Sequence, residues 1–208
     1  MTRPLHILYV APQLPKRSET FVYRELFALR RGGLAVSAAS LHAPERGLGD
    51  EALERLSEEA ICLYGNPARL LGAMAAEALT HPVSAVSTLL RAACDAAVAR
   101  DIRGAARVKV LWHGAVGLAL ARRARAVGAT HLHAHFAHVS ASLAMYAAHQ
   151  LGCRFSFTGH AADLFRDRCL LTQKLERAAF VSCISRWHRA FYQSLVNRPD
   201  AAYPVVRC

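Results

Sequence analysis

The sequence predicts an α/β protein built on a doubly wound parallel β-sheet. Short apolar runs of strand length alternate with longer segments of helical periodicity along the 208 residues. The first apolar run, residues 5–11, is continuous, which is typical of a parallel strand that helices cover on both faces. About half of the residues are apolar, and the chain has neither an internal repeat nor a low-complexity linker. We therefore expect one domain spanning residues 1–208.

The chain opens with a predicted β-α-β unit. Residues 5–11 form its first strand, and Ser18 is expected to cap a helix that stops at Gly32-Gly33. Residues 34–41 form the second strand. The free amides and the dipole at the start of this helix would face the carboxyl edge of the sheet, which makes the helix N-terminus a candidate anion site.

The middle of the chain is predicted to be mostly helical. Asp50 can cap a short helix through Glu59, and residues 60–64 read as a third strand. From residue 67 to 127 the sequence is rich in alanine and arginine, with breaks expected near His81-Pro82 and Gly104. Two or three helices fit this extra helical segment.

The last third of the chain returns to alternating strands and helices. Ser185 is expected to cap a late helix whose apolar side carries Trp187, Phe191 and Leu195. The other expected elements are a strand that begins at residue 130, a helix that includes residues 139–147, a strand over 154–158, a short helix over 170–177, a strand over 180–184 and a last strand over 203–206.

Two adjacent strands of this last third carry the candidate site residues. His131, His133 and His135 alternate with apolar residues, so the imidazoles share one side of a strand and must meet a cleft or a partner. The next strand ends in Gly159-His160, where glycine permits a tight turn. Side chains beyond that point reach the carboxyl edge of the sheet, where open parallel sheets bind ligands, so His160 and Asp163 are the leading candidates.

Composition leaves several partners open. The formal charge is +11 and most basic residues are arginine, which fits phosphate recognition, a nucleic acid or an anionic membrane surface, but equally fits an arginine-rich genome. Six scattered cysteines without a C-x-x-C pair argue against a zinc ribbon and a disulfide scaffold, and favour the cytoplasm. No signal peptide or uncharged run long enough to span a bilayer is evident, so membrane contact would be peripheral.

The strand that carries His131, His133 and His135 also suggests a metal site. Two histidines at i and i+2 on a strand suit a shared ion and resemble the H-x-H pair of metal-dependent hydrolases. Those enzymes carry the pair on their first strand, whereas here it falls late in the chain. We therefore expect no metal, with the histidines hydrogen-bonded to backbone or neighbouring groups.

Taken together, the motifs resemble the N-terminal domain of a GT-B glycosyltransferase of the large retaining family 4, in the branch that makes bacterial exopolysaccharides and colanic-acid-type polymers. The resemblance covers the chain from end to end. The residues that carry it are Leu14-Pro15-Lys16-Arg17-Ser18-Glu19-Thr20-Phe21, His131-Leu132-His133-Ala134-His135-Phe136, Phe157-Thr158-Gly159-His160-Ala161-Ala162-Asp163-Leu164-Phe165 and Cys183-Ile184-Ser185.

The resemblance implies a Rossmann-like domain that forms one half of a GT-B fold and binds a sugar or lipid-linked glycan acceptor at the cytoplasmic membrane face. It implies that His160 faces the transferred sugar and that Asp163 orients the acceptor or a loop. It places Ser18, Glu19, Thr20 and Gly159 in substrate binding, with His133 and His135 shaping the same wall. Transfer would proceed with retention by stabilising the departing phosphate, with a nucleotide sugar as donor and no further cofactor.

Two departures from the family pattern bear on activity. The turn from Pro12 to Arg17 lacks the Gly-Gly loop with which many relatives approach the donor diphosphate. Val205-Val206-Arg207-Cys208 resembles the interdomain strand, and the donor-binding half that follows it in the family is missing from these residues. The expectation is an acceptor-binding half that is truncated at the linker and has little or no transferase activity alone.

Two other function classes remain open. A non-catalytic anion-binding module, for nucleic acid or anionic lipid, would show affinity that falls steeply with salt. The chain lacks the interleaved aromatic and basic residues of single-strand binders, so no nucleic acid is expected. A metal-dependent hydrolase would contain zinc, iron or manganese when purified without chelator.

Overall fold

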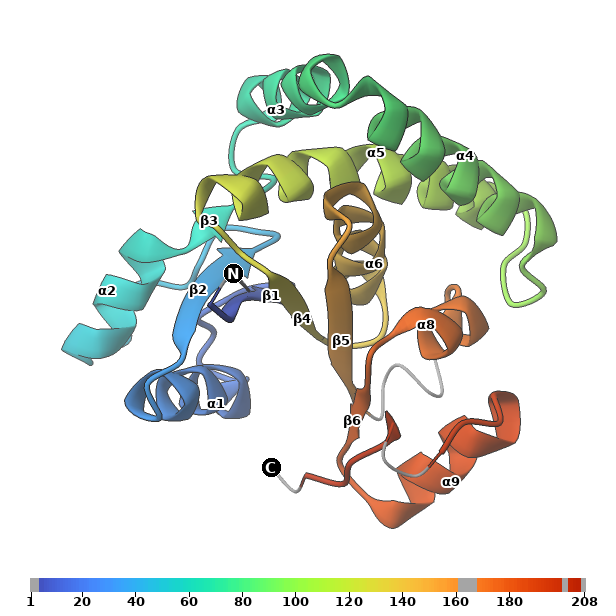
Figure 1. The fold of residues 1–208 in the computed structure, drawn as a ribbon. Coiled ribbons are helices and arrows are strands. Elements are labelled where there is room, and N and C mark those ends of the chain that lie inside the picture. The colour runs from blue at the N-terminus through green and yellow to red at the C-terminus, as the bar shows by residue number, and fades with distance from the viewer. Residues whose placement is uncertain (1–3, 161–167, 200–201, 207–208) are drawn as a thin grey trace.

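A parallel sheet forms the centre of the protein. The computed structural model describes residues 4–160, 168–199 and 202–206. They contain a six-stranded, all-parallel sheet in the order β3-β2-β1-β4-β5-β6 (Figure 1). Its strands are β1 (His6–Ala11), β2 (Ala35–Ser40), β3 (Ile61–Cys62), β4 (His131–His135), β5 (Arg154–Gly159) and β6 (Val181–Cys183). The predicted Rossmann-like, doubly wound fold is confirmed.

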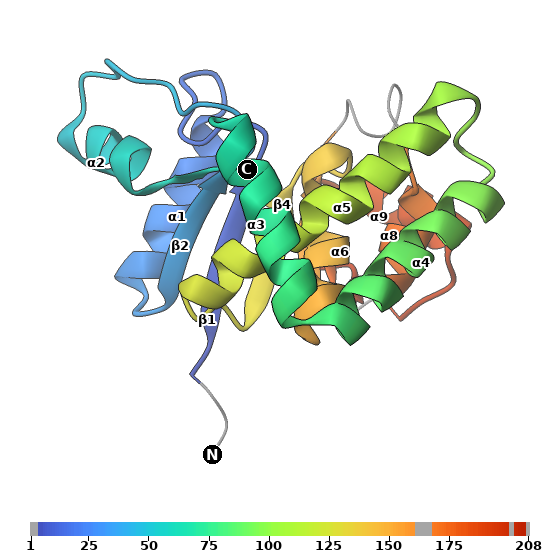
Figure 2. The ribbon, with the colours of Figure 1, turned by 90° about the horizontal axis from the view of Figure 1, so that it is seen from above.

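Helices cover the sheet in layers. They are α1 (Thr20–Arg31), α2 (Glu51–Glu59), α3 (Pro67–Thr80), α4 (Pro82–Val98), α5 (Ala105–Ala126), α6 (Val139–Leu151), α8 (Leu171–Arg177) and α9 (Arg186–Leu195). Figures 1 and 2 show α3 and α4 as an outer layer over α5. The predicted breaks in this helical segment are confirmed, since Pro82 starts α4 and Gly104, at φ 52°, precedes α5.

Alternation along the strands divides the interior into two apolar cores. Leu132 and Ala134 of β4 face the core that contains α5 and α6, whereas Tyr9 of β1 faces the core against α1 and α2. The histidines of β4 therefore point to the α1 side of the sheet, as the period of two predicts. On that side the apolar core stops at β1, and β4 and β5 present polar side chains instead.

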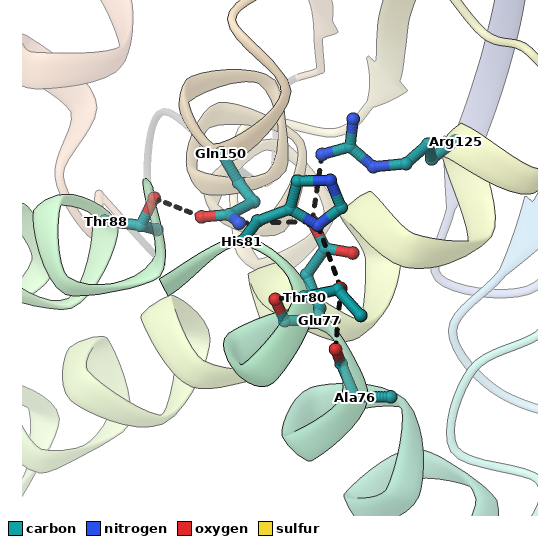
Figure 3. A network of polar contacts seen from close by, with 7 residues as sticks. All are labelled: Ala76, Glu77, Thr80, His81, Thr88, Arg125 and Gln150. Atoms are coloured by element: carbon teal, nitrogen blue, oxygen red, sulfur yellow. Dashed lines mark hydrogen bonds and ion pairs between the residues drawn. The ribbon is translucent and has the colours of Figure 1, made fainter. Parts of the chain in front are cut away.

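A buried carboxylate joins the outer helices to the layer beneath. The side chain of Glu77 on α3 is fully buried and accepts hydrogen bonds from Arg125 of α5 at 3.0 Å and Gln150 of α6 at 3.1 Å. His81 lies 3.4 Å from the same carboxylate oxygen, and Gln150 also accepts a hydrogen bond from Thr88 of α4 (Figure 3). Four helices thus meet through one polar network.

Three sequence-based predictions about local structure are wrong. Ser18 does not cap α1, because it lies exposed in the preceding turn and Glu19 occupies the N-cap position. The buried residues of α9 are His188 and Tyr192 rather than the predicted apolar stripe, and Trp187 is exposed because the helix packs through its other face. In the described part of residues 203–206, the predicted last strand is reduced to one parallel bridge between Val205 and Cys183.

No helix in the described part of the chain combines the length and apolarity that crossing a bilayer requires.

Candidate functional site

Aromatic and imidazole rings meet at the point where the strand order reverses. β1 and β4 are neighbours there, and open α/β sheets bind ligands at the carboxyl ends of such strands. The ring of His160, directly after β5, lies 4.7 Å from Phe21 of α1 and 4.7 Å from Phe136 between ring centroids. We call Phe21, Phe136, His138 and His160 the edge cluster. Helix α1 and the turn after β4 thus both contact the residue that follows β5.

The turn after β4 has an unusual backbone that neighbouring groups hold in place. Phe136 has φ 71°, a left-handed conformation that is uncommon for a bulky residue and clusters at functional sites. Its N–H donates to the Thr158 carbonyl at 2.9 Å. The fully buried ammonium of Lys174 donates to the carbonyls of Ala137 at 2.6 Å and His138 at 2.9 Å. This turn is therefore fixed by the sheet on one side and by α8 on the other.

The environment of His160 keeps its imidazole neutral. Burial, followed by the charges of His135 and His188, lowers the pKa of His160 to about 4. A neutral imidazole at pH 7 has one N–H donor and one acceptor nitrogen, which suits a hydroxyl-bearing ligand. The sequence predicted His160 at this edge from its place after a strand, and the structure places it there.

Gly159 allows close packing against α9, and the turn predicted after Gly159-His160 continues into residues outside the described part of the chain. Its φ is not in the left-handed region, and it is the last residue of β5. A Cβ at this position would collide with the Tyr192 hydroxyl and lie 2.9 Å from Cε1 of His188, both on α9. The missing side chain allows α9 to approach the end of β5. Its role in substrate binding stays a prediction.

The loop before α1 brings Ser18, Glu19 and Thr20 to the same edge of the sheet. Ser18 and Thr20 are exposed, while one oxygen of Glu19 accepts a 2.6 Å hydrogen bond from Lys16. The other oxygen of Glu19 is buried and makes no hydrogen bond to any described residue. The predicted role of all three in substrate binding is untested by this geometry.

Behind the edge cluster lies a layer of polar side chains on β4 and β5. His133 is 5 % exposed and His135 is fully buried. The two ring nitrogens of His133 contact the hydroxyls of Ser156 at 2.7 Å and Thr158 at 3.1 Å. His135 has no exposed surface, whereas His133 lines a cavity of about 250 Å³ on this side of the sheet. Their predicted role in the wall of the site stays a prediction.

Glu25 is a functional candidate that the sequence reading missed. It lies on α1 beside the buried Val22 and Leu26, and Oε2 of its carboxylate is 3.3 Å from Nε2 of His135. Burial raises its pKa, but contacts with His135 and Tyr9 outweigh this and lower the pKa of Glu25 to about 2. In the sequence, the feature that could have indicated Glu25 was its position next to the apolar stripe of a helix that follows a buried strand.

Asp163, the second leading candidate, lies outside the described residues. A comparison with protein-family models found no match, and a comparison with curated proteins found no significant match.

Proposed function

We propose that these residues form the acceptor-binding side of a retaining, GT-B-type glycosyltransferase. The observation that carries the proposal is the position of His160. A neutral imidazole packs against two phenylalanine rings at the carboxyl edge where the strand order reverses. A sugar offers hydroxyls to the imidazole and apolar ring faces to Phe21 and Phe136.

In this proposal His160 faces the transferred sugar and hydrogen-bonds to it. Lys174 and the neighbouring β5 backbone fix the Phe136 turn, so the rings that frame the sugar are pre-positioned. Asp163 keeps its predicted role of orienting the acceptor or a loop. The donor is a nucleotide sugar, and stabilisation of the departing phosphate drives transfer with retention.

Acceptor binding tests this proposal directly. Saturation-transfer NMR with a panel of oligosaccharides and short-chain polyprenyl-diphosphate glycans should detect a ligand whose affinity changes little with salt. His160→Ala should weaken that binding at least about 10-fold, since it removes a partly buried hydrogen-bonding group. His149→Ala is the matched control, because His149 lies in the last turn of α6, far along that helix from its start at the edge cluster.

Two results would contradict the proposal: no binding by any glycan in the panel, or binding that survives His160→Ala. In a protein that also carries a donor-binding domain, His160→Ala should lower kcat about 100-fold or more. Turnover of a nucleotide sugar by the 208-residue chain alone would refute the expectation that this half is inactive by itself.

We also propose peripheral contact between the outer helices and an anionic membrane, which would bring a lipid-linked acceptor to the site. Leu79 at the end of α3 is 81 % exposed and Val83 at the start of α4 is 83 % exposed. Exposed apolar side chains recur along these two helices and include Leu71, Val86, Leu89, Leu90 and Val98. Apolar side chains beside arginines, on a chain of net charge +11, suit an anionic bilayer surface.

Vesicle flotation separates this membrane contact from other binding modes. Anionic vesicles should carry the chain and neutral vesicles should not, and the pair Leu79→Asp and Val83→Asp should abolish flotation. Salt-sensitive binding to nucleic acid of mixed sequence, unchanged in this pair, would instead favour the anion-binding module.

A further inference from the structure

Three side chains of ligand type lie together where α1 meets β4. Glu25, His133 and His135 each offer one ligand atom, and these atoms all lie within 4.8 Å of one another. Among the described residues, no other group of three histidine, cysteine, aspartate or glutamate side chains is arranged in this way. Ligand atoms of a tetrahedral zinc site are about 3.4 Å apart, given bonds of about 2.1 Å. The 3.3 Å between Glu25 and His135 already has this value, and small side-chain rotations would bring His133 to it.

His135 carries an unsatisfied polar group toward this point. Its side chain is fully buried, and neither ring nitrogen makes a hydrogen bond to another described residue. Nε2 is close to Glu25 but is not aligned with the carboxylate as a hydrogen-bond donor. Buried imidazole nitrogens normally have partners, so a lone pair left in this position calls for a ligand. A metal ion bound at Nε2 would supply that partner.

The surrounding side chains match those that orient metal ligands. The Tyr9 hydroxyl donates to Oε1 of Glu25 at 2.7 Å and leaves Oε2 for an ion. Whichever nitrogen of His133 binds the ion, the other keeps its contact with Ser156 or Thr158. Outer hydrogen bonds of this kind fix the orientation of imidazole and carboxylate ligands.

Access from solvent also fits a metal. A cavity of about 250 Å³ adjoins the group, with Tyr9, Glu25 and His133 in its lining. The Glu25 side chain is 36 % exposed, which leaves a path from solvent.

We propose that Glu25, His133 and His135 bind a divalent transition-metal ion of the zinc type, with a fourth position open to the adjoining cavity. Two imidazoles and one carboxylate form a donor set that suits zinc and its first-row neighbours. The ion would tie α1 to β4. Because Phe21 lies one turn before Glu25 on α1, the ion would also fix Phe21 against His160.

Zinc titration of the chelator-treated chain by calorimetry tests the site. We expect one zinc per chain, with affinity at least about 10-fold weaker in Glu25→Gln and in His135→Gln. Zinc should raise the thermal unfolding midpoint of the wild type but not that of Glu25→Gln. His81→Gln is the matched control, because His81 lies 3.4 Å from Glu77 in a His-Glu pair, and its zinc affinity should equal that of the wild type.

Glu25→Gln decides the outcome even if His135→Gln fails to fold, since the change is isosteric and the side chain is partly exposed. The absence of saturable zinc binding would overturn the proposal. Binding that Glu25→Gln leaves unchanged would also overturn it and would mark the zinc as adventitious. Acceptor binding at His160 is measured separately, in the presence of chelator. The proposed acceptor site and the proposed zinc site can therefore fail independently of each other.

Discussion

At the scale of single residues, Gly159 shows how a missing side chain positions an element. Its hydrogen faces the Tyr192 hydroxyl and the His188 ring, so the end of β5 and α9 meet at a distance that excludes a methyl group. Because His160 follows directly, the position of α9 is linked to the edge cluster through this one contact.

Gly159→Ala is expected to destabilise the protein by about 1–3 kcal/mol, because the added methyl group overpacks the contact with α9. Urea unfolding measures the change. Gly72→Ala is the control: a Cβ there meets no described atom within 4 Å, and Gly72 lies inside α3. This control should gain up to about 1 kcal/mol. Equal effects of the two substitutions would show that the contact with α9 is not tight.

At the scale of elements, the Glu77 network determines how the outer helices attach to the sheet layer. Its carboxylate is buried, and Arg125 supplies a charge-assisted hydrogen bond. A buried carboxylate that loses its cation keeps its desolvation cost without compensation.

Arg125→Met should therefore destabilise the protein by about 1–3 kcal/mol. This loss is smaller than that of a fully buried ion pair, because the arginine side chain is partly exposed to solvent. Glu77→Gln should cost less, since the amide removes the buried charge. Chemical denaturation of both single variants and the double variant gives the coupling between the two residues. A double variant whose loss equals the sum of the single losses would show that they do not interact.

Most of the elements could be predicted because their signals are local. Proline at residue 82, glycine at residue 104 and the apolar runs of the strands act on their own neighbours, so the helix breaks and the fold class followed from sequence. The face of α9 could not be predicted, because its packing is decided by Gly159, which is distant in sequence. Glu25 was missed for the same reason: its partners Tyr9 and His135 lie on two different strands.

At the scale of the whole molecule, buried neutral histidines set the pH range of stability. Burial, with the charges of Lys174 and Lys109, lowers the pKa of His113 to about 4, and burial lowers the pKa of His188 to about 4. In the unfolded chain both titrate near pH 6.5. Between pH 6.5 and 4 the unfolded state therefore binds more protons than the folded state.

The contribution of these histidines to the free energy of unfolding should be fully present above about pH 6.5. It should fall as the pH drops toward 4, by at most about 3 kcal/mol for each histidine. Thermal unfolding midpoints across this range measure the loss. His113→Asn should flatten the slope, because the variant has no imidazole to protonate. A midpoint independent of pH between 4 and 6.5 would contradict the prediction.

The contacts of Lys174 carry a consequence for how the protein can diverge in evolution. Its ammonium binds the main-chain carbonyls of Ala137, His138 and Cys169, which every amino acid possesses. Substitutions at those three positions would leave these main-chain acceptors in place, so the contacts with Lys174 do not depend on which side chains stand there. Lysine at position 174 has no such freedom, since no other side chain supplies a compact, three-donor cation at that depth. Among diverging relatives, we therefore expect the buried lysine at position 174 to be retained.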